Sequence, residues 1–248
     1  IGSLPFEGGS FDLVAGAGPM LIFHKDRPQA MREVYRVLRD GGLVFIEVPD
    51  ATRFASRPDA PFQEFSTEHI NFFSSRSLAN LMRAHGFEPV HIEPAEVEQN
   101  VGTMSPVISG FYRKGPTLAV RPEYDETTER GLSEYVGQSV AVDGRIRETI
   151  DRLVQERVPI LVWGVGTHTS RLMVTSRLAE IDIRAFVDSN PRYQGKTMNG
   201  VPILAPADLP GRSEPILISS RVFQREIELQ IREELGCDNE LILLYQVG

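Results

Sequence analysis

The stretch LPFEGGSFDLVAGAGPMLIFHKDRPQAMREVYRVLRDGGLVFIEVPD, residues 4–50, decides the fold class of the first part of the chain. Its run FDLVAGAG is continuously apolar, which is typical of a strand buried on both faces of a sheet. A helix is expected next, because apolar residues recur at helical spacing from Met31 to Leu38, and Gly41 and Gly42 are expected to end it. The run LVFIEV then predicts a second buried strand. Strand, helix and strand in this order indicate an α/β unit with a parallel sheet.

A second helix and two further strands are expected to complete this unit. Ser74 or Ser75 is a suitable N-cap for a helix that Gly86 would close. Strands are predicted over residues 88–92 and 107–112. A proline-containing segment follows, and the apolar positions of residues 125–157 predict one or two helices with an interruption near Gly144.

The last third of the chain repeats the α/β pattern. Strands are predicted over residues 159–163, 181–187, 201–204, 215–219 and 240–245, with helices between them. Alternation at these spacings indicates a second parallel sheet. The predicted domains are the C-terminal part of one α/β domain at residues 1–115, a linker with helices at 116–156, and a second α/β domain at 157–248.

The bulk composition narrows the class of function. The chain has 248 residues, a net charge of −8 and a single cysteine, Cys237. An acidic chain lacks the basic surface that nucleic acid or anionic lipid requires, so a small-molecule substrate is favoured. One cysteine excludes an intrachain disulfide and a cysteine-based zinc site, and no other metal site is predicted. No targeting signal and no run of roughly 20 apolar residues is found, so a cytoplasmic protein is expected.

Residues 4–50 resemble the class I S-adenosylmethionine-dependent methyltransferases, over the fourth strand, its helix and the fifth strand of their sheet. The segment EHINFFSSRSLANLMRAHGF continues the resemblance, which covers about residues 1–114. It implies S-adenosylmethionine as cofactor, bound at the carboxyl edge of a Rossmann-like sheet. It also implies that the glycine-rich cofactor loop and the acidic residue after the second strand precede Ile1.

The resemblance implies a set of cofactor-binding positions. Ile1 and Gly2 correspond to the loop beside adenine, and the end of the fourth strand supplies Ala15, Gly16, Ala17 and Gly18. Small residues at a strand end allow a ligand to approach closely. The alternative is an ordinary strand-to-helix turn, which glycine also favours.

The segment PFQEFSTEHINFF, residues 61–73, is similar to sugar C-methyltransferases, which also carry a second α/β domain. The resemblance implies that His69 lines the substrate pocket as a base and that Glu68 orients it. A loop held by a hydrogen bond at the start of a helix is the alternative interpretation of the same two residues.

The segment VWGVGTHTSRLM indicates a candidate nucleotide loop in the second domain, formed by Gly164 and Gly166, with Asp188 at the end of the next strand. Glycines free amide groups for a phosphate, and an acidic residue can bind a ribose. Thr169 stands where a third glycine is usual. His168, in the first turn of the helix, is expected at the surface.

The leading hypothesis is a methyltransferase that acts on a sugar or nucleotide-sugar-like metabolite, at carbon or oxygen. An NAD-dependent nucleotide-sugar oxidoreductase or epimerase that uses the second domain is one alternative. A non-enzymatic scaffold derived from a methyltransferase is the other. The oligomeric state stays open.

Overall fold

The computed structural model describes residues 4–16, 27–56, 60–65, 70–100, 103–116 and 121–245. These residues form two compact units, and the long helix α4 (Glu126–Glu156) contributes to both. The first unit comprises Ile1–Pro58 and Glu64–Gln138, and the second comprises Asp59–Gln63 and Ser139–Gly248. The domain boundaries at residues 115 and 156 that the sequence suggests stay a prediction. Contacts between residues divide the chain into its two units at a point within α4.

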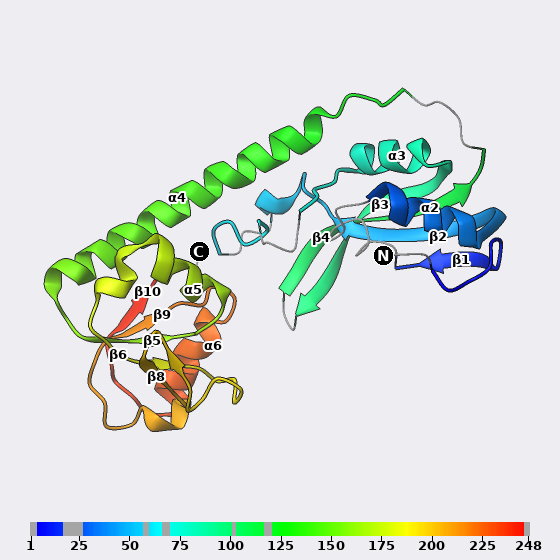
Figure 1. Cartoon of the computed structure of the whole chain (residues 1–248). Helices are drawn as coiled ribbons and strands as arrows, with labels where there is room; N and C mark the ends of the chain where they lie inside the picture. The colour runs from blue at the N-terminus through cyan, green and yellow to red at the C-terminus, as the bar shows by residue number, and fades with distance from the viewer. Residues whose placement is uncertain are drawn as a thin grey trace. The chain divides into compact units, whose positions relative to one another are not determined.

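The first unit contains a four-stranded sheet in the order β1-β2-β4-β3 (Figure 1). Its strands are β1 (Phe11–Ala15), β2 (Leu38–Pro49), β3 (Phe87–Asn100) and β4 (Thr103–Lys114). β1 and β2 are parallel, as the sequence predicts, while β4 is antiparallel to both β2 and β3. The last two strands are longer than predicted, because their ladder runs almost the whole length of each strand.

Helices α2 (Arg27–Val37) and α3 (Ser75–Ala84) pack on one face of this sheet. β2 alternates accordingly: Val44, Ile46 and Val48 are buried under the helices, while the residues between them are half-buried. An alternating strand covered on one face is the expected consequence. The core of the first unit lies between this face and the two helices.

Two sequence-based expectations for this unit are wrong. The first helix ends at Val37, not at Gly41 and Gly42, because Leu38 is fully buried and pairs with Phe11 of β1. β1 is not buried on both faces, since Leu13 is 49% exposed and the described residues supply only β2 as a neighbour. Among the described residues, β1 is an edge strand of the sheet.

α3 begins and ends as predicted. The Ser74 hydroxyl accepts the Ser77 backbone N–H, and the Ser77 side chain accepts the Ser74 N–H in return, which forms a capping box. Gly86 adopts a positive φ of 80° just after the helix, where glycine avoids the steric cost of other residues.

The second unit is built on a sheet in the order β10-β9-β5-β6-β8-β7, parallel except for the β7–β8 pair (Figure 1). Its strands are β5 (Ile160–Trp163), β6 (Ile183–Val187), β7 (Thr197–Met198), β8 (Val201–Leu204), β9 (Ile216–Ile218) and β10 (Leu241–Leu243). The five longer strands lie where the sequence predicts them. Helical turns at Arg177–Glu180 and Pro206–Asp208 connect some of them.

Helices cover both faces of this second sheet. Apolar residues of α4 and of α5 (Thr167–Thr175) share one cluster with Val162, Phe186 and Leu217. On the opposite face, α6 (Gln224–Leu229) and the π-helical turn Gln230–Glu234 pack on Leu161 and Trp163. The sheet is therefore buried on both sides, which agrees with its nearly continuous apolar strands.

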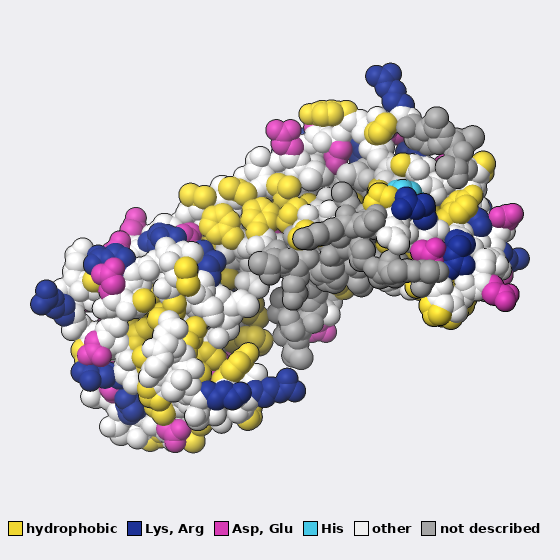
Figure 2. Space-filling model, viewed as in Figure 1, with side chains coloured by type: hydrophobic (Ala, Val, Ile, Leu, Met, Phe, Trp, Pro, Cys, Tyr) yellow, Lys and Arg dark blue, Asp and Glu magenta, His cyan; other side chains and the backbone are white. Residues whose placement is uncertain are grey.

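α4 is one continuous helix of 31 residues, so the interruption predicted near Gly144 is wrong. Ile146 and Ile150, just after that glycine, are fully buried against the second sheet, and their packing maintains the helix through it. Figure 2 shows apolar side chains along α4. Two valines of this helix, Val136 and Val140, are 37% and 57% exposed. On the visible face, acidic and basic side chains are interspersed.

Candidate functional site

The carboxyl ends of β1 and β2 lie at the same edge of the first sheet, because the two strands are parallel and Ala15 pairs with Phe45. Ala15 and Gly16 are both exposed there. Gly16 has a φ of 82°, and a Cβ added to it would meet no atom of the described residues within 4 Å. These two predicted cofactor positions therefore border open space at the edge where such sheets bind ligands.

The other predicted site residues of this unit lie outside the described residues. They are the cofactor positions Ile1, Gly2, Ala17 and Gly18 and the catalytic pair Glu68 and His69.

Asp50 organises the loop that follows β2. Its side chain is almost fully buried, and its Oδ1 accepts the backbone N–H of Thr52 at 3.0 Å and the Thr52 hydroxyl at 2.6 Å. Arg53 Nε donates to Oδ2 at 3.1 Å. The sequence indicates Asp50 only as the end of a strand, but the structure shows a carboxylate that holds Thr52 in place.

A second carboxylate, Asp125, joins the beginnings of α3 and α4. It accepts the hydroxyls of Ser74 at 2.6 Å, Thr127 at 2.6 Å and Thr128 at 2.7 Å. Burial opposes its ionisation, but these hydroxyls outweigh burial and hold the pKa of Asp125 well below its usual range. Asp125 is therefore ionised at neutral pH and accepts on both oxygens.

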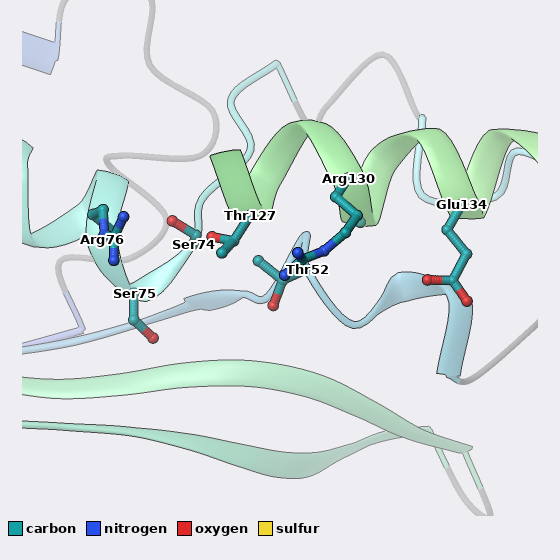
Figure 3. Close-up of a pocket in the computed structure, with 8 residues that line it drawn as sticks. Thr52, Ser74, Ser75, Arg76, Thr127, Arg130 and Glu134 are labelled. Carbon is teal, nitrogen blue, oxygen red and sulfur yellow. The ribbon is translucent and has the colours of Figure 1, made fainter. Parts of the chain in front are cut away.

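A polar pocket of about 440 Å³ lies between the loop after β2, the start of α3 and the first turns of α4 (Figure 3). It is lined by Thr52, Ser74, Ser75, Arg76, Thr127, Arg130, Gly131 and Glu134. α4 comes so close that a Cβ on Gly131 would lie 2.5 Å from Thr52 Cα. No motif in the sequence indicates this pocket, because its residues come from three separate segments.

In the second unit, the predicted glycine loop and Asp188 lie together. Gly164 has a φ of 105°, and Gly166 is the N-cap of α5 without a side-chain cap. Asp188 accepts the N–H of Val165 at 3.0 Å and that of Asn190 at 2.8 Å. Both of its carboxylate oxygens thus brace backbone within the protein.

Thr169 fits the position of the third glycine because its hydroxyl has buried partners. It lies 2.7 Å from the Gly164 carbonyl oxygen and 2.9 Å from Ser219 Oγ, and both threonine and Ser219 are buried. The hydroxyl therefore links β5, α5 and β9, and the loop tolerates a side chain there.

A cavity of about 580 Å³ opens at the carboxyl ends of β5, β6 and β9 in this unit. Its lining combines the glycine loop with Asp188, Ser189 and Ser220, the cation Arg221, and the aromatic ring of Phe223, which is 47% exposed. Amide donors, hydroxyls and an exposed ring are the groups that bind a small polar ligand with a planar part.

His168 is half-buried rather than at the surface as predicted. Its Nε2 lies 2.7 Å from the Tyr245 hydroxyl. Burial, assisted by the nearby Arg171 guanidinium, lowers the pKa of His168 to about 4. The imidazole is therefore neutral at pH 7 and supplies no positive charge for an anion.

Within the described residues, no group of three or more His, Cys, Asp or Glu side chains is arranged to hold a metal ion. The same part of the chain contains no helix that is both long and apolar enough to cross a membrane.

Comparison with known proteins agrees with the resemblance of the first unit. Residues 18–92 match the family model described as a methyltransferase domain. A second family model, described as C2185-like, N-terminal, matches residues 156–243.

Two individual relatives are described as methyltransferases. The chain is 25% identical to the C-methyltransferase NovU of Streptomyces niveus over 195 residues, which cover 75% of this chain and 46% of NovU. It is 32% identical to a protein of Mycolicibacterium smegmatis described as a probable S-adenosylmethionine-dependent methyltransferase. This second match extends over 89 residues, which are 36% of this chain and 33% of that protein. The matched part thus spans less than half the length of either relative.

Among solved structures, a methyltransferase of Methanosarcina mazei is 21% identical, with a TM-score of 0.35, over 46% of this chain and 63% of that one.

Proposed function

We propose that the chain is part of an S-adenosylmethionine-dependent methyltransferase whose acceptor is a sugar or a nucleotide-linked sugar. The observation that carries the proposal is the match to the C-methyltransferase NovU. The matched stretch of 195 residues is longer than either compact unit, so it includes parts of both. The sugar acceptor rests on the similarity of residues 61–73 to sugar C-methyltransferases.

Ala15 and Gly16 fit the edge of a cofactor site. The exposed end of β1 and the open space around Gly16 leave room for a ligand to contact the backbone. When bound, S-adenosylmethionine supplies a methyl group activated by its sulfonium. Ile1, Gly2, Ala17 and Gly18 complete this side of the site.

His69 removes the proton from the acceptor atom, carbon or oxygen, and Glu68 orients the imidazole. Histidine suits this role because its ordinary pKa is close to neutral pH. Most of the rate then comes from holding acceptor and cofactor in line, with this one base assisting.

The sheet of the first unit continues beyond β1 in the functional protein. Two observations support this: β1 is an edge strand among the described residues, and the apolar side chains Leu13 and Phe111 on the sheet are 49% and 37% exposed. A class I methyltransferase sheet would provide a neighbour for that edge and cover that surface.

The second unit is Rossmann-like and binds a nucleotide. Support comes from the cavity at the carboxyl ends of its strands, next to Gly164 and Gly166. NAD-dependent oxidoreduction has less support, because both of the relatives reported above are described as methyltransferases.

Equilibrium binding of S-adenosylmethionine and of NAD, measured on the protein as its gene encodes it, tests the proposal. We expect S-adenosylmethionine to bind and NAD not to bind. Gly16→Ala should weaken binding of S-adenosylmethionine by about tenfold, since it places a side chain at a positive φ beside the cofactor.

Gly41→Ala is the matched control, because Gly41 has a similar φ of 73° and open space but lies at the opposite end of β2. It should leave binding unchanged. Binding of NAD alone, or equal losses in the two variants, would refute the proposed function.

A further inference from the structure

We propose that the polar pocket at the start of α4 binds an uncharged polyhydroxylated ring, the sugar part of the acceptor. This inference rests on the proposed function in one respect, namely that the bound sugar is the acceptor of the methyl group. The pocket itself is defined by residues of the first unit alone.

The threonine hydroxyls of the pocket present acceptors rather than donors. Thr52 donates its hydroxyl hydrogen to Asp50 at 2.6 Å, and Thr127 donates its hydrogen to Asp125 at 2.6 Å. A hydroxyl has one hydrogen, so the remaining lone pairs of both oxygens can only accept. Each carboxylate also polarises its hydroxyl, which strengthens the hydrogen bond that the oxygen accepts.

Arg130 and Glu134 bring one hydrogen-bond donor group and one acceptor group to the pocket. They lie one turn apart on α4, and Figure 3 shows both extending from the side of the helix that faces the Thr52 loop. Within the described part of the chain, neither side chain makes a hydrogen bond or an ion pair. The guanidinium supplies donors and the carboxylate supplies acceptors, and both are available for a ligand.

This pattern fits neighbouring hydroxyl groups better than it fits an anion. Each hydroxyl of a sugar ring donates one hydrogen bond and accepts others, so it can use Thr52, Thr127 and Glu134 as acceptors and Arg130 as donor. The second arginine of the lining, Arg76, already donates to the Tyr124 carbonyl oxygen and lies 3.8 Å from a carboxylate oxygen of Glu123. A phosphate has few or no hydrogens to donate, and besides Arg130 it would meet the charge of Glu134 and that of Asp125 behind Thr127. The acceptor-rich lining therefore selects an uncharged polyol.

Gly131 maintains the spacing of the pocket. Because it has no side chain, α4 lies directly against Thr52, and this contact brings Arg130 and Glu134 to the same cavity as the threonine. The backbone of the pocket is fixed by packing before any ligand binds, so ordering on binding is confined to exposed side chains such as Arg130 and Glu134.

Nuclear magnetic resonance titration of the protein tests the inference directly. The probes are methyl α-D-glucopyranoside, methyl α-D-galactopyranoside and inorganic phosphate, and the signals are the Thr52 and Thr127 methyl groups and the Arg130 Nε–H. We expect at least one glycoside to shift all three signals in a saturable way, and phosphate to leave them unchanged.

Arg130→Gln and Glu134→Gln should each weaken glycoside binding by about fivefold or more, since each removes a charged partner. Both side chains are exposed, so the fold should be retained, as a thermal melt would verify. Arg145→Gln and Glu148→Gln are matched controls, exposed on the same helix but outside the pocket, and should bind as the parent does.

Glycosides that leave the three signals unchanged would overturn the inference, as would phosphate binding instead or equal affinities in pocket and control variants. Binding of S-adenosylmethionine is measured separately. Binding of the cofactor without binding of any glycoside would refute this inference and leave the methyltransferase assignment standing. Binding of a glycoside without binding of the cofactor would refute the methyltransferase assignment and leave this inference standing.

Discussion

Single carboxylates organise the polar side of the first unit. Asp50 fixes the loop after β2, and Asp125 gathers hydroxyls from the two helices that begin beside it. Each aspartate accepts several hydrogen bonds, and a charged acceptor of this kind strengthens them. The hydroxyl oxygens of Thr52 and Thr127 reach the pocket in a fixed orientation for that reason.

Replacement of Asp125 by Asn should lower the free energy of unfolding at pH 7 by about 1–3 kcal/mol, because charge-assisted hydrogen bonds to three hydroxyls are weakened. The pKa of Asp125 is depressed in the folded state, so its contribution is full above the unfolded-state pKa. The contribution decreases as the pH falls below about 4, because the unfolded chain then takes up a proton that the folded protein does not, so the parent and the variant should differ less at pH 3 than at pH 7. Urea unfolding at pH 7 and at pH 3 measures both values.

Glu129→Gln is the control for that change, since Glu129 is an exposed acid in the first turn of the same helix. It should change stability by no more than about 0.5 kcal/mol. An Asp125→Asn variant as stable as this control at pH 7 would show that the hydroxyl cluster contributes nothing.

At the scale of elements, α4 illustrates how one helix serves two cores. Its first turns pack on the loop after β2 through Leu132 and Tyr135, and its last turns cover the second sheet through Ile146 and Ile150. The glycines along it meet different surroundings. Gly131 is pressed against Thr52, while nothing lies within 4 Å of a Cβ at Gly137 or Gly144.

These surroundings predict opposite effects of alanine along α4. Gly131→Ala should destabilise the protein by about 1–3 kcal/mol, because the new methyl group overlaps backbone that must move. Gly137→Ala and Gly144→Ala should stabilise it by about 1 kcal/mol each, through better helix propensity alone. Urea unfolding of the three variants checks the signs, and a stable Gly131→Ala protein would contradict the close packing.

At the scale of the whole molecule, the chain divides into two units with separate apolar cores. The clusters of the second unit contain residues between Ile146 and Tyr245 and none from the first sheet. A core of that size is sufficient for independent folding of about 100 residues. α4 connects the two units along a single helix.

Residues 139–248 expressed alone should therefore fold. An amide correlation spectrum of this fragment should overlay with the signals of the same residues in the whole chain, except near Ser139 and near the partners of residues 59–63. A spectrum with the narrow amide dispersion of an unfolded chain would show that the second unit depends on the first for its stability.

Much of the architecture follows from local sequence. The period of apolar residues, the cap at Ser74 and the turn at Gly86 predict α3 correctly, because each depends on neighbours within a few residues. The parallel strands of the second sheet and the association of the glycine loop with Asp188 were also predictable, since carboxyl ends of adjacent parallel strands meet.

Other features depend on contacts between distant segments. The first helix ends at Val37 because Leu38 pairs with Phe11, and α4 continues through Gly144 because Ile146 and Ile150 are buried. His168 is half-buried, and its Nε2 lies 2.7 Å from the hydroxyl of Tyr245, which lies 77 residues away in the sequence. Local propensity contains no information on such partners, so packing overrides it.

The sequence by itself determined that this protein has two α/β parts, the first of which resembles methyltransferases, since periodicity and motifs are local properties. The tertiary structure alone decided the polar pocket. Its residues at 52, 74–76 and 127–134 meet only because Gly131 lets α4 lie against the loop after β2. Close approach of three distant segments is a property of packing, and no spacing along the chain encodes it.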